Sequence, residues 1–248
     1  MAQSSVIGSK AAKNGQVAGS AVGGTAQTRT QAGAKATAKR SKATARDTGP
    51  GVGFTRHFTQ PGIDPLEAGS PGEHGEPLVY ERRSSVITNP DGSIVFKMEG
   101  AEVPKSWSQL ATDIVISKYF RKAGLHGDKD QGEKSVQQVV HRIAHTIRGA
   151  GEKLGGYFAT TADADVFEAE LSWLMLHQYG AFNSPVWFNC GLFHEYGIVG
   201  SGGNWAVNLQ TGESEQTANA YERPQCSACF IQRANDDLMS IYDLMKSE

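Results

Sequence analysis

The chain has little cysteine, no long apolar run and almost no acidic residue in its first fifty positions. Its three cysteines, Cys190, Cys226 and Cys229, are too few and too clustered for the disulfide framework of a secreted protein. No stretch approaches the roughly 18 consecutive apolar residues of a membrane-spanning helix, and the N-terminus lacks the apolar core of a secretory signal. We therefore expect a cytoplasmic protein without a membrane partner, whose cysteines are reactive or bind metal.

Charge divides the chain near residue 50. Of the 24 Lys and Arg, eight lie in residues 1–50, together with one of the 26 Asp and Glu, so this part carries +7 and the rest −9. Residues 1–50 also contain few apolar residues, so this stretch is predicted to be a disordered basic tail. The alternatives are an organelle transit peptide and a nucleic-acid contact. The tail lacks the arginine-rich amphipathic face of the first and the interleaved aromatics of the second, so no specific nucleic acid is expected as a partner.

Residues 51–77 are rich in Gly and Pro, which predicts an extended linker, with order beginning near Leu78. Two stretches with β-forming composition follow, Leu78–Thr88 and Ser93–Met98. Asn89–Gly92 between them has the composition of a type I turn, so the sequence predicts a β-hairpin.

Three stretches after the hairpin have helical periodicity, because apolar residues recur three or four positions apart. The first begins at the candidate N-cap Ser106 and ends at Gly124, the second ends at Gly149 and the third at Gly180. The third is expected to be capped by Thr161 or Asp163. The residues expected to face the core are Trp107, Leu110, Ile114 and Tyr119, then Val136, Val139, Val140, Ile143, Ala144 and Ile147, then Phe167, Leu171, Leu174, Met175 and Tyr179.

Two histidines on the second predicted helix, His141 and His145, have the spacing that places two imidazoles on one face for a metal. A metalloprotease helix has Glu directly after the first of them, where this chain has Arg142. We therefore interpret both histidines as structural and assign no metal ligand to this helix.

The cysteines allow two further interpretations. Cys190 and His194 precede Cys226 and Cys229, and two such pairs of ligands could close a tetrahedral zinc site. A small zinc-stabilised binding module is therefore an alternative, although no compact knuckle pattern separates the pairs. The two thiols of Cys226-x2-Cys229 also suit disulfide exchange. Because they follow a helical region instead of opening a βαβ unit, a thioredoxin-like fold is not expected.

Several motifs in the same order resemble the class II, adenosylcobalamin-dependent ribonucleotide reductases. The longest are Phe182–Asn189, FNSPVWFN, and Tyr221–Gln232, YERPQCSACFIQ. The resemblance covers about residues 78–248. The shorter motifs are Tyr80–Arg83, Pro104–Gln109, Lys118–Lys122 and Asn204-Trp205.

The resemblance implies an α/β fold, a ten-stranded α/β barrel in the complete enzyme. This chain would be an N-terminal fragment: a mainly helical domain with a hairpin over residues 78–180, then the start of the barrel over 181–248, with Cys226–Gln232 as its first strand. It implies reduction of ribonucleotides, expected to be diphosphates, to 2′-deoxyribonucleotides for DNA synthesis and repair. The fragment alone is expected to be inactive, with the radical cysteine, the partner cysteine and an Asn/Glu pair beyond residue 248.

The implied cofactor is adenosylcobalamin, bound mainly by parts of the protein outside this fragment. The implied partners are a ribonucleotide, a dNTP effector, a thioredoxin-like dithiol reductant and a second copy of the complete chain. In the family's Ser-Ala-Cys-Phe motif the cysteine is one of two that reduce the ribose and end as a disulfide, so Cys229 takes that role and Cys226 does not match.

The resemblance also implies that Ser184 and Ala228 contact substrate and that Asp236 binds the effector. Each has a plainer alternative: Ser184 is a turn hydroxyl, and the acidic pair Asp236-Asp237 caps a helix.

Overall fold

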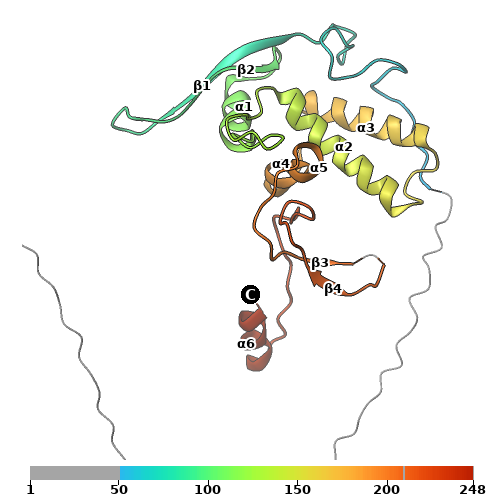
Figure 1. Cartoon of the computed structure of the whole chain (residues 1–248), viewed down its shortest axis with the longest axis vertical. Coiled ribbons are helices and arrows are strands. Elements are labelled where there is room, and N and C mark those ends of the chain that lie inside the picture. The colour runs from blue at the N-terminus through green and yellow to red at the C-terminus, as the bar shows by residue number, and fades with distance from the viewer. Residues whose placement is uncertain (1–50, 209, 248) are drawn as a thin grey trace, which may run out of the picture. The chain divides into compact units, whose positions relative to one another are not determined.

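The computed structural model describes residues 51–208 and 210–247, which belong to one compact unit (Figure 1). The predicted tail, residues 1–50, lies outside the described residues. The described part is a mixed α/β fold with two separate two-stranded sheets, and it does not form a ten-stranded barrel. The elements are β1 Tyr80–Thr88, β2 Ile94–Pro104, α1 Gln109–Ile114, the π-helix η1 Val115–Tyr119, α2 Val136–Leu154, α3 Thr161–Leu176, α4 Ser184–Asn189, α5 Leu192–Tyr196, β3 Trp205–Val207, β4 Ser214–Gln216 and α6 Leu238–Ser247.

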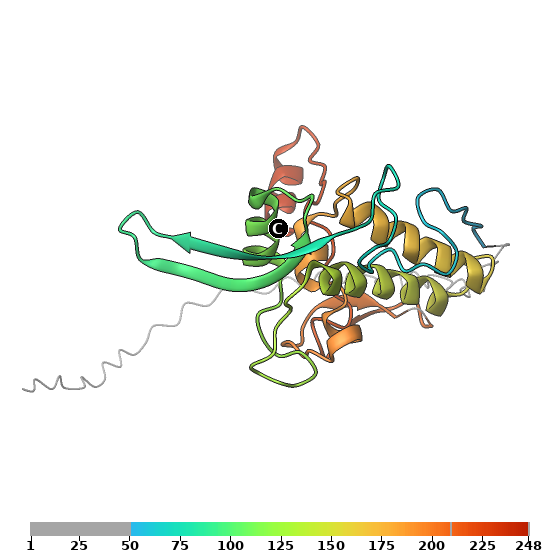
Figure 2. The same ribbon diagram turned by 90° about the horizontal axis from the view of Figure 1, so that it is seen from above.

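The hairpin is confirmed. Strands β1 and β2 pair antiparallel, and Gly92, with a φ of 84°, closes the turn by donating its N–H to the Asn89 carbonyl at 2.9 Å. Strand β2 continues to Pro104, beyond the predicted end at Met98, because a bulge after Arg83 lets the pairing resume. Figure 2 shows the hairpin running out from the helices, with its turn at the far end.

Helix α2 forms as predicted along its apolar face. Ser135 and Gln138 make a capping box, and the predicted inward-facing residues from Val136 to Ala144 are fully buried. The predicted end at Gly149 is wrong, because the helix runs on to Leu154. A single glycine costs a helix only about 1 kcal/mol. Gly151 even serves packing, since a Cβ there would lie 2.7 Å from the Phe158 ring.

The first predicted helix is partly wrong. Its N-cap is Ser108 instead of Ser106, and at Val115 the helix becomes a π-helix that ends at Tyr119, before Gly124. A π turn holds one more residue than an α turn, so the inward face rotates. Leu110 and Ile114, predicted to face the core, are exposed, while Ile116 is fully buried.

Helix α3 begins at the N-cap Thr160, whose hydroxyl accepts from the Asp163 N–H and donates to the Asp163 carboxylate. Neither predicted cap, Thr161 or Asp163, is the N-cap residue itself. The helix ends at Leu176 instead of Gly180, and the left-handed residue after it is Gln178, with a φ of 62°. The apolar face is wider than predicted, because Trp173 and Leu176 are buried, whereas Tyr179 is exposed.

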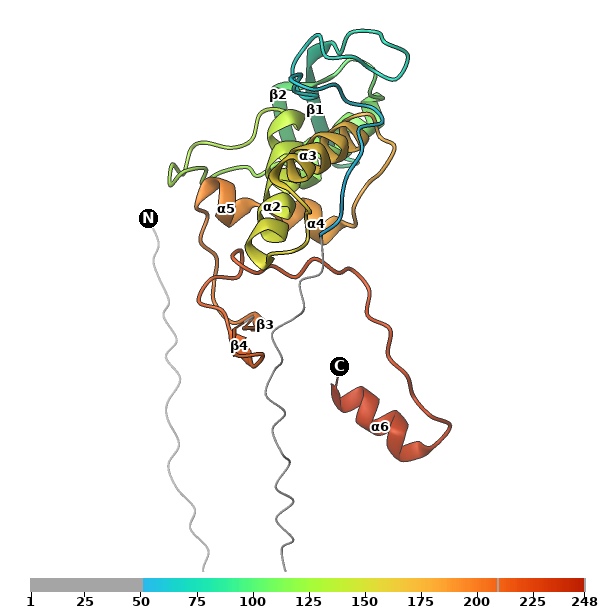
Figure 3. The same ribbon diagram turned by 90° about the vertical axis from the view of Figure 1, so that its right-hand side faces the viewer.

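Residues 51–77 contain no helix, as their proline content predicts, but they pack along α3 (Figure 3). Phe58 stacks on Trp173 with ring centroids 4.3 Å apart, and the Glu170 carboxylate accepts from the Thr59 N–H at 2.9 Å. The expectation that order begins near Leu78 is therefore wrong. Two aromatic residues, Phe54 and Phe58, supply the apolar contact that the overall composition conceals.

The predicted strand Cys226–Gln232 is not formed, because residues 217–237 run as irregular backbone and turns. A strand needs a neighbour for its N–H and C=O groups, and within residues 51–208 and 210–247 no strand pairs with this stretch. No helix in these ranges is long and apolar enough to cross a membrane.

Candidate functional site

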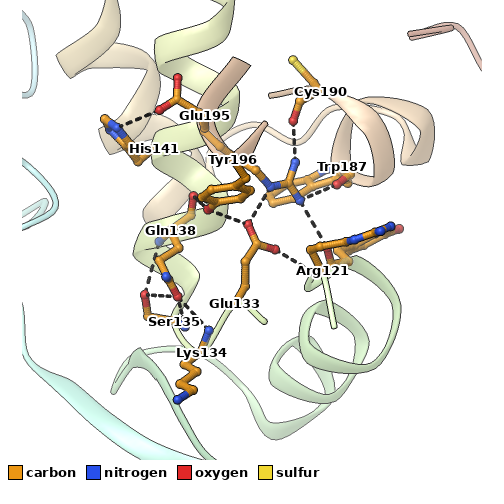
Figure 4. A network of polar contacts seen from close by, with 12 residues as sticks. Arg121, Glu133, Lys134, Ser135, Gln138, His141, Trp187, Cys190, Glu195 and Tyr196 are labelled. Atoms are coloured by element: carbon orange, nitrogen blue, oxygen red, sulfur yellow. Dashed lines mark hydrogen bonds and ion pairs between the residues drawn. The ribbon is translucent and has the colours of Figure 1, made fainter. Parts of the chain in front are cut away.

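A buried ion pair lies at the centre of the fold. The Arg142 guanidinium on α2 donates from Nε to Glu133 Oε1 at 2.7 Å, and both side chains are at most 1% exposed. Glu133 also accepts from the Tyr196 hydroxyl at 3.0 Å and from the backbone N–H of Arg121 at 2.6 Å (Figure 4). Burial, and then the neighbouring Glu133 carboxylate, raises the pKa of Tyr196. The buried charges are thus paired and hydrogen-bonded, as the interior requires.

The remaining nitrogens of Arg142 hold the segment around α4. They donate to the carbonyls of Cys190 at 2.6 Å, Trp187 at 2.8 Å and Tyr119 at 3.2 Å. Sequence reasoning treated Arg142 only as the residue between two histidines. The available signal was its position, since it directly precedes Ile143 and flanks the buried stripe of α2.

Ser184 is the first residue of α4 and is half-buried. Its hydroxyl lies 3.1 Å from the Tyr119 hydroxyl, and the Tyr119 ring packs on Trp187 and Phe188. Asn183, not Ser184, is the N-cap of this helix. The Ser184 hydroxyl is therefore positioned by a tyrosine from a distant part of the chain.

The three cysteines have different surroundings. Cys190 is buried at the end of α4, Cys226 is half-buried and packs against the same hydrophobic core, and Cys229 is exposed, as is Ala228. The hydrogen bond between the two thiols, together with burial, raises the pKa of Cys190. The same hydrogen bond lowers the pKa of Cys226 to about 7, against the opposing effect of burial.

The four residues of the zinc alternative do not form a metal site. Among the residues that the structure describes, no group of three or more His, Cys, Asp or Glu side chains could hold a metal ion. His194 instead lies with Nε2 3.1 Å from the Glu222 carbonyl. The zinc-stabilised module therefore gains no support.

His141 and His145 lie side by side on α2, with ring centroids 5.2 Å apart and about half of each side chain exposed. The Glu168 carboxylate of α3 accepts a hydrogen bond from His145 Nδ1 at 3.0 Å, and Glu195 of α5 lies 3.6 Å from His141 Nε2. These contacts join three helices at the surface, which agrees with a structural role.

The two acidic residues before α6, Asp236 and Asp237, differ in their hydrogen bonds. The Asp237 carboxylate accepts from the Ser240 N–H at 2.9 Å, the bond expected of a helix cap. The cap is therefore Asp237, and Asp236 is not needed for it.

Residues 81–178 match the family model described as "Class II vitamin B12-dependent ribonucleotide reductase". Over this region the chain is similar to the class II, vitamin B12-dependent ribonucleotide reductases. Three curated proteins named vitamin B12-dependent ribonucleotide reductase are similar to it. They are those of Rhodopirellula baltica, 45% identical over 169 residues (68% of this chain, 16% of that protein), Bradyrhizobium diazoefficiens, 40% over 192 (65% and 15%), and Streptomyces coelicolor, 38% over 212 (85% and 18%).

The chain thus spans between 15% and 18% of the length of these reductases. The family model covers the hairpin, α2 and α3, so it includes Glu133 and Arg142 but ends before Ser184 and Cys229. The roles assigned to Ser184, Ala228, Cys229 and Asp236 stay predictions.

The described residues do not fit the vitamin B12 group that the reductase name implies. Hollows such as the one between α2 and Arg223 are open grooves lined by charged residues, among them Glu152, Lys153 and Glu195. A large organic cofactor is instead held in a cavity that encloses most of its surface.

Proposed function

We propose that this chain supplies the N-terminal helical part of an enzyme that reduces ribonucleotides to 2′-deoxyribonucleotides for DNA synthesis and repair. One observation carries the proposal beyond the family match. Cys229, in the segment that resembles the family's reductive-cysteine motif, is exposed and lies outside the hydrophobic core. A cysteine that serves structure is usually buried and inert, whereas a reactive thiol must be accessible.

The proposed chemistry of Cys229 is a two-electron reduction. Its thiol and that of a second cysteine, supplied by the rest of the enzyme, lose two hydrogens and form a disulfide. The ribose C2′ loses its hydroxyl as water and gains a hydrogen in its place. A thioredoxin-like dithiol then returns Cys229 to the thiol. We propose ribonucleoside diphosphates as substrates, contacted by Ser184 and Ala228.

The proposal includes adenosylcobalamin, which supplies the radical that starts the reaction and is bound by parts of the enzyme other than the described residues. It also includes a homodimer of the complete enzyme and a cytoplasmic location, where thiols are kept reduced.

The test is a chimera of the Rhodopirellula baltica reductase in which this chain replaces the matching 169 residues. With a dithiol reductant and adenosylcobalamin, the chimera is expected to form deoxynucleotides, whereas the 248-residue chain alone forms none. In the chimera, Cys229→Ser should abolish multiple turnover.

The matched control is Cys226→Ser, three residues away, which should keep most of the activity. Equal loss from both substitutions would contradict the role of Cys229. One zinc per chain after a chelator wash would favour the binding module instead.

The effector role of Asp236 is proposed for the same enzyme. Its carboxylate would accept hydrogen bonds from a bound dNTP at a site coupled to the substrate site. In the chimera, Asp236→Ala should weaken dNTP-dependent switching between substrates and leave the basal reduction of one substrate largely intact. Unchanged switching in the folded variant would exclude this residue from the effector site.

A further inference from the structure

The fold brings together two cysteines that lie far apart in the sequence. Cys190 ends α4, and Cys226 lies on the irregular segment that returns to it. The residues directly before them are joined, since the Asn189 side chain donates to the Gln225 carbonyl at 3.5 Å. Cys226 packs against the hydrophobic core that contains Cys190. The spacing in the sequence would instead have paired Cys226 with Cys229.

The two thiols are unequal. Cys190 is 6% exposed, and its carbonyl is fixed by Arg142 while its sulfur points away from that network (Figure 4). Cys226 is half-buried and can be reached from solvent. The interaction with Cys190 lowers the pKa of Cys226 against the opposing effect of burial, which favours the thiolate of Cys226 over that of Cys190. The proton stays with Cys190, whose pKa is raised.

We propose that Cys190 and Cys226 form a peroxide-sensitive dithiol, separate from the reductive role proposed for Cys229. The Cys226 thiolate attacks a hydroperoxide, the O–O bond breaks, and Cys226 becomes a sulfenic acid while an alcohol or water leaves. The Cys190 thiol then attacks the sulfenic sulfur, forming the Cys190–Cys226 disulfide and releasing water. A dithiol reductant restores both thiols.

The disulfide would have a defined structural effect. Cys226 lies three residues before Cys229, and Cys190 lies at the end of the helix that starts with Ser184. A bond between them ties the two segments that carry Ser184 and Cys229. The same bond is absent under reducing conditions, so the tie responds to peroxide.

The test uses the 248-residue chain, reduced and washed with chelator, then exposed to an equimolar amount of hydrogen peroxide and blocked with an alkylating agent. Cleavage after Glu195 and Glu222 separates Cys190 from Cys226, whereas trypsin leaves all three cysteines on one peptide. Mass spectrometry of the unreduced digest is expected to find the Cys190 peptide linked to the peptide of residues 223 onward. Cys229→Ser should leave this link intact, which assigns it to Cys226.

Two variants test the order of the steps. In Cys190→Ala the Cys226 sulfenic acid has no resolving thiol, so a dimedone adduct at Cys226 should increase at least several-fold over the unaltered chain. The pH midpoint of Cys226 alkylation should be higher in this variant than in the unaltered chain, because the interaction with Cys190 that lowers the pKa is lost. In Cys226→Ser no link to Cys190 should form.

Two results would overturn the proposal: a wild-type link between Cys226 and Cys229 in place of the link to Cys190, or a link to Cys190 that persists in Cys226→Ser. Because the unaltered chain alone gives the first result, the outcome does not depend on any variant folding. The assay involves no ribonucleotide, so failure here is distinguishable from failure of the proposed reductase function.

Discussion

Residues 51–198 and residues 199–247 of this chain differ in how much they bury. All the buried hydrophobic residues described lie between Leu66 and Ile198, whereas Asn219 is the one buried residue described in the second part. The second part exposes large apolar side chains instead, with Ile231 fully exposed. It also carries Cys229 and Asp236. Stability and the proposed reductive thiol are therefore assigned to different stretches, and substitutions can separate them.

The largest loss of stability is expected from Arg142→Ala in the first part. Removing the guanidinium leaves Glu133 buried without its charge partner, which costs about 3–5 kcal/mol of the free energy of unfolding. Urea unfolding of the 248-residue chain measures it. The matched control is Lys97→Ala, which removes the exposed Lys97–Glu99 ion pair and should cost about 0–1 kcal/mol. Similar losses from both would mean that the buried network does not stabilise the fold.

Two tryptophans allow a direct comparison of the two parts. Trp173 is 1% exposed on α3, and Trp205 is 69% exposed on β3. Trp173→Ala should lower the free energy of unfolding by about 3–5 kcal/mol, because it leaves a cavity. Trp205→Ala should stay within about 0.5 kcal/mol, as for most surface substitutions. A comparable loss at Trp205 would show that the second part is as well packed as the first.

A smaller and local effect is expected at α6. Asp237→Ala removes the N-cap and should destabilise this helix by about 0.5–2 kcal/mol, read as faster amide exchange over Leu238–Ser247. Asp236→Ala, one residue earlier, should leave the exchange unchanged. Faster exchange in the Asp236 variant alone would reassign the cap.

The smallest effect is expected from acid on the segment that packs along α3. Burial raises the pKa of Glu170, but hydrogen bonds from Thr59, His57 and Phe58 outweigh it, and the net pKa is lowered from 4.5. The folded state therefore favours the ionised carboxylate. Its contribution is present above pH 4.5 and is lost as the pH falls through the lowered pKa.

Accordingly, amides of Phe58 and Thr59 should lose protection from exchange below pH 4.5 before the core unfolds. Glu170→Gln should reproduce part of this loss at neutral pH. Protection that is equal at pH 7 and pH 3.5 would argue against the carboxylate as the anchor.

Sequence patterns correctly predicted the elements that are stabilised by interactions between residues close together in the sequence. The stripe of α2 and the turn at Asn89–Gly92 depend on neighbours within one or two turns of the chain, so their periodicity and composition sufficed. The prediction of the core-facing residues in the first helix was wrong around Val115, because a π turn has no periodic pattern in the sequence. The prediction for residues 51–77 was wrong for another reason. Two phenylalanines determine how this segment packs, and two residues have little effect on its average composition.

The candidate site was predictable only in part. Motif resemblance directed attention to Ser184 and Cys229, but the partner of Ser184 is Tyr119 and the partner of Cys226 is Cys190. Both contacts join residues that only the folded chain brings together. Spacing along the chain, which suggested zinc ligands and a Cys226–Cys229 pair, contains no information about such contacts.

The position of Arg142 also bears on the order in which the chain folds. Its guanidinium meets the carbonyls at the ends of two helices, η1 through Tyr119 and α4 through Trp187 and Cys190. A cation at a helix C-terminus is favourable, and helices of five and six residues do not persist alone in water. The C-terminal carbonyls of both helices are therefore hydrogen-bonded by Arg142 only after α2 has packed against them. We expect such non-local closure to place η1 and α4 late in folding, after the nucleation of α2.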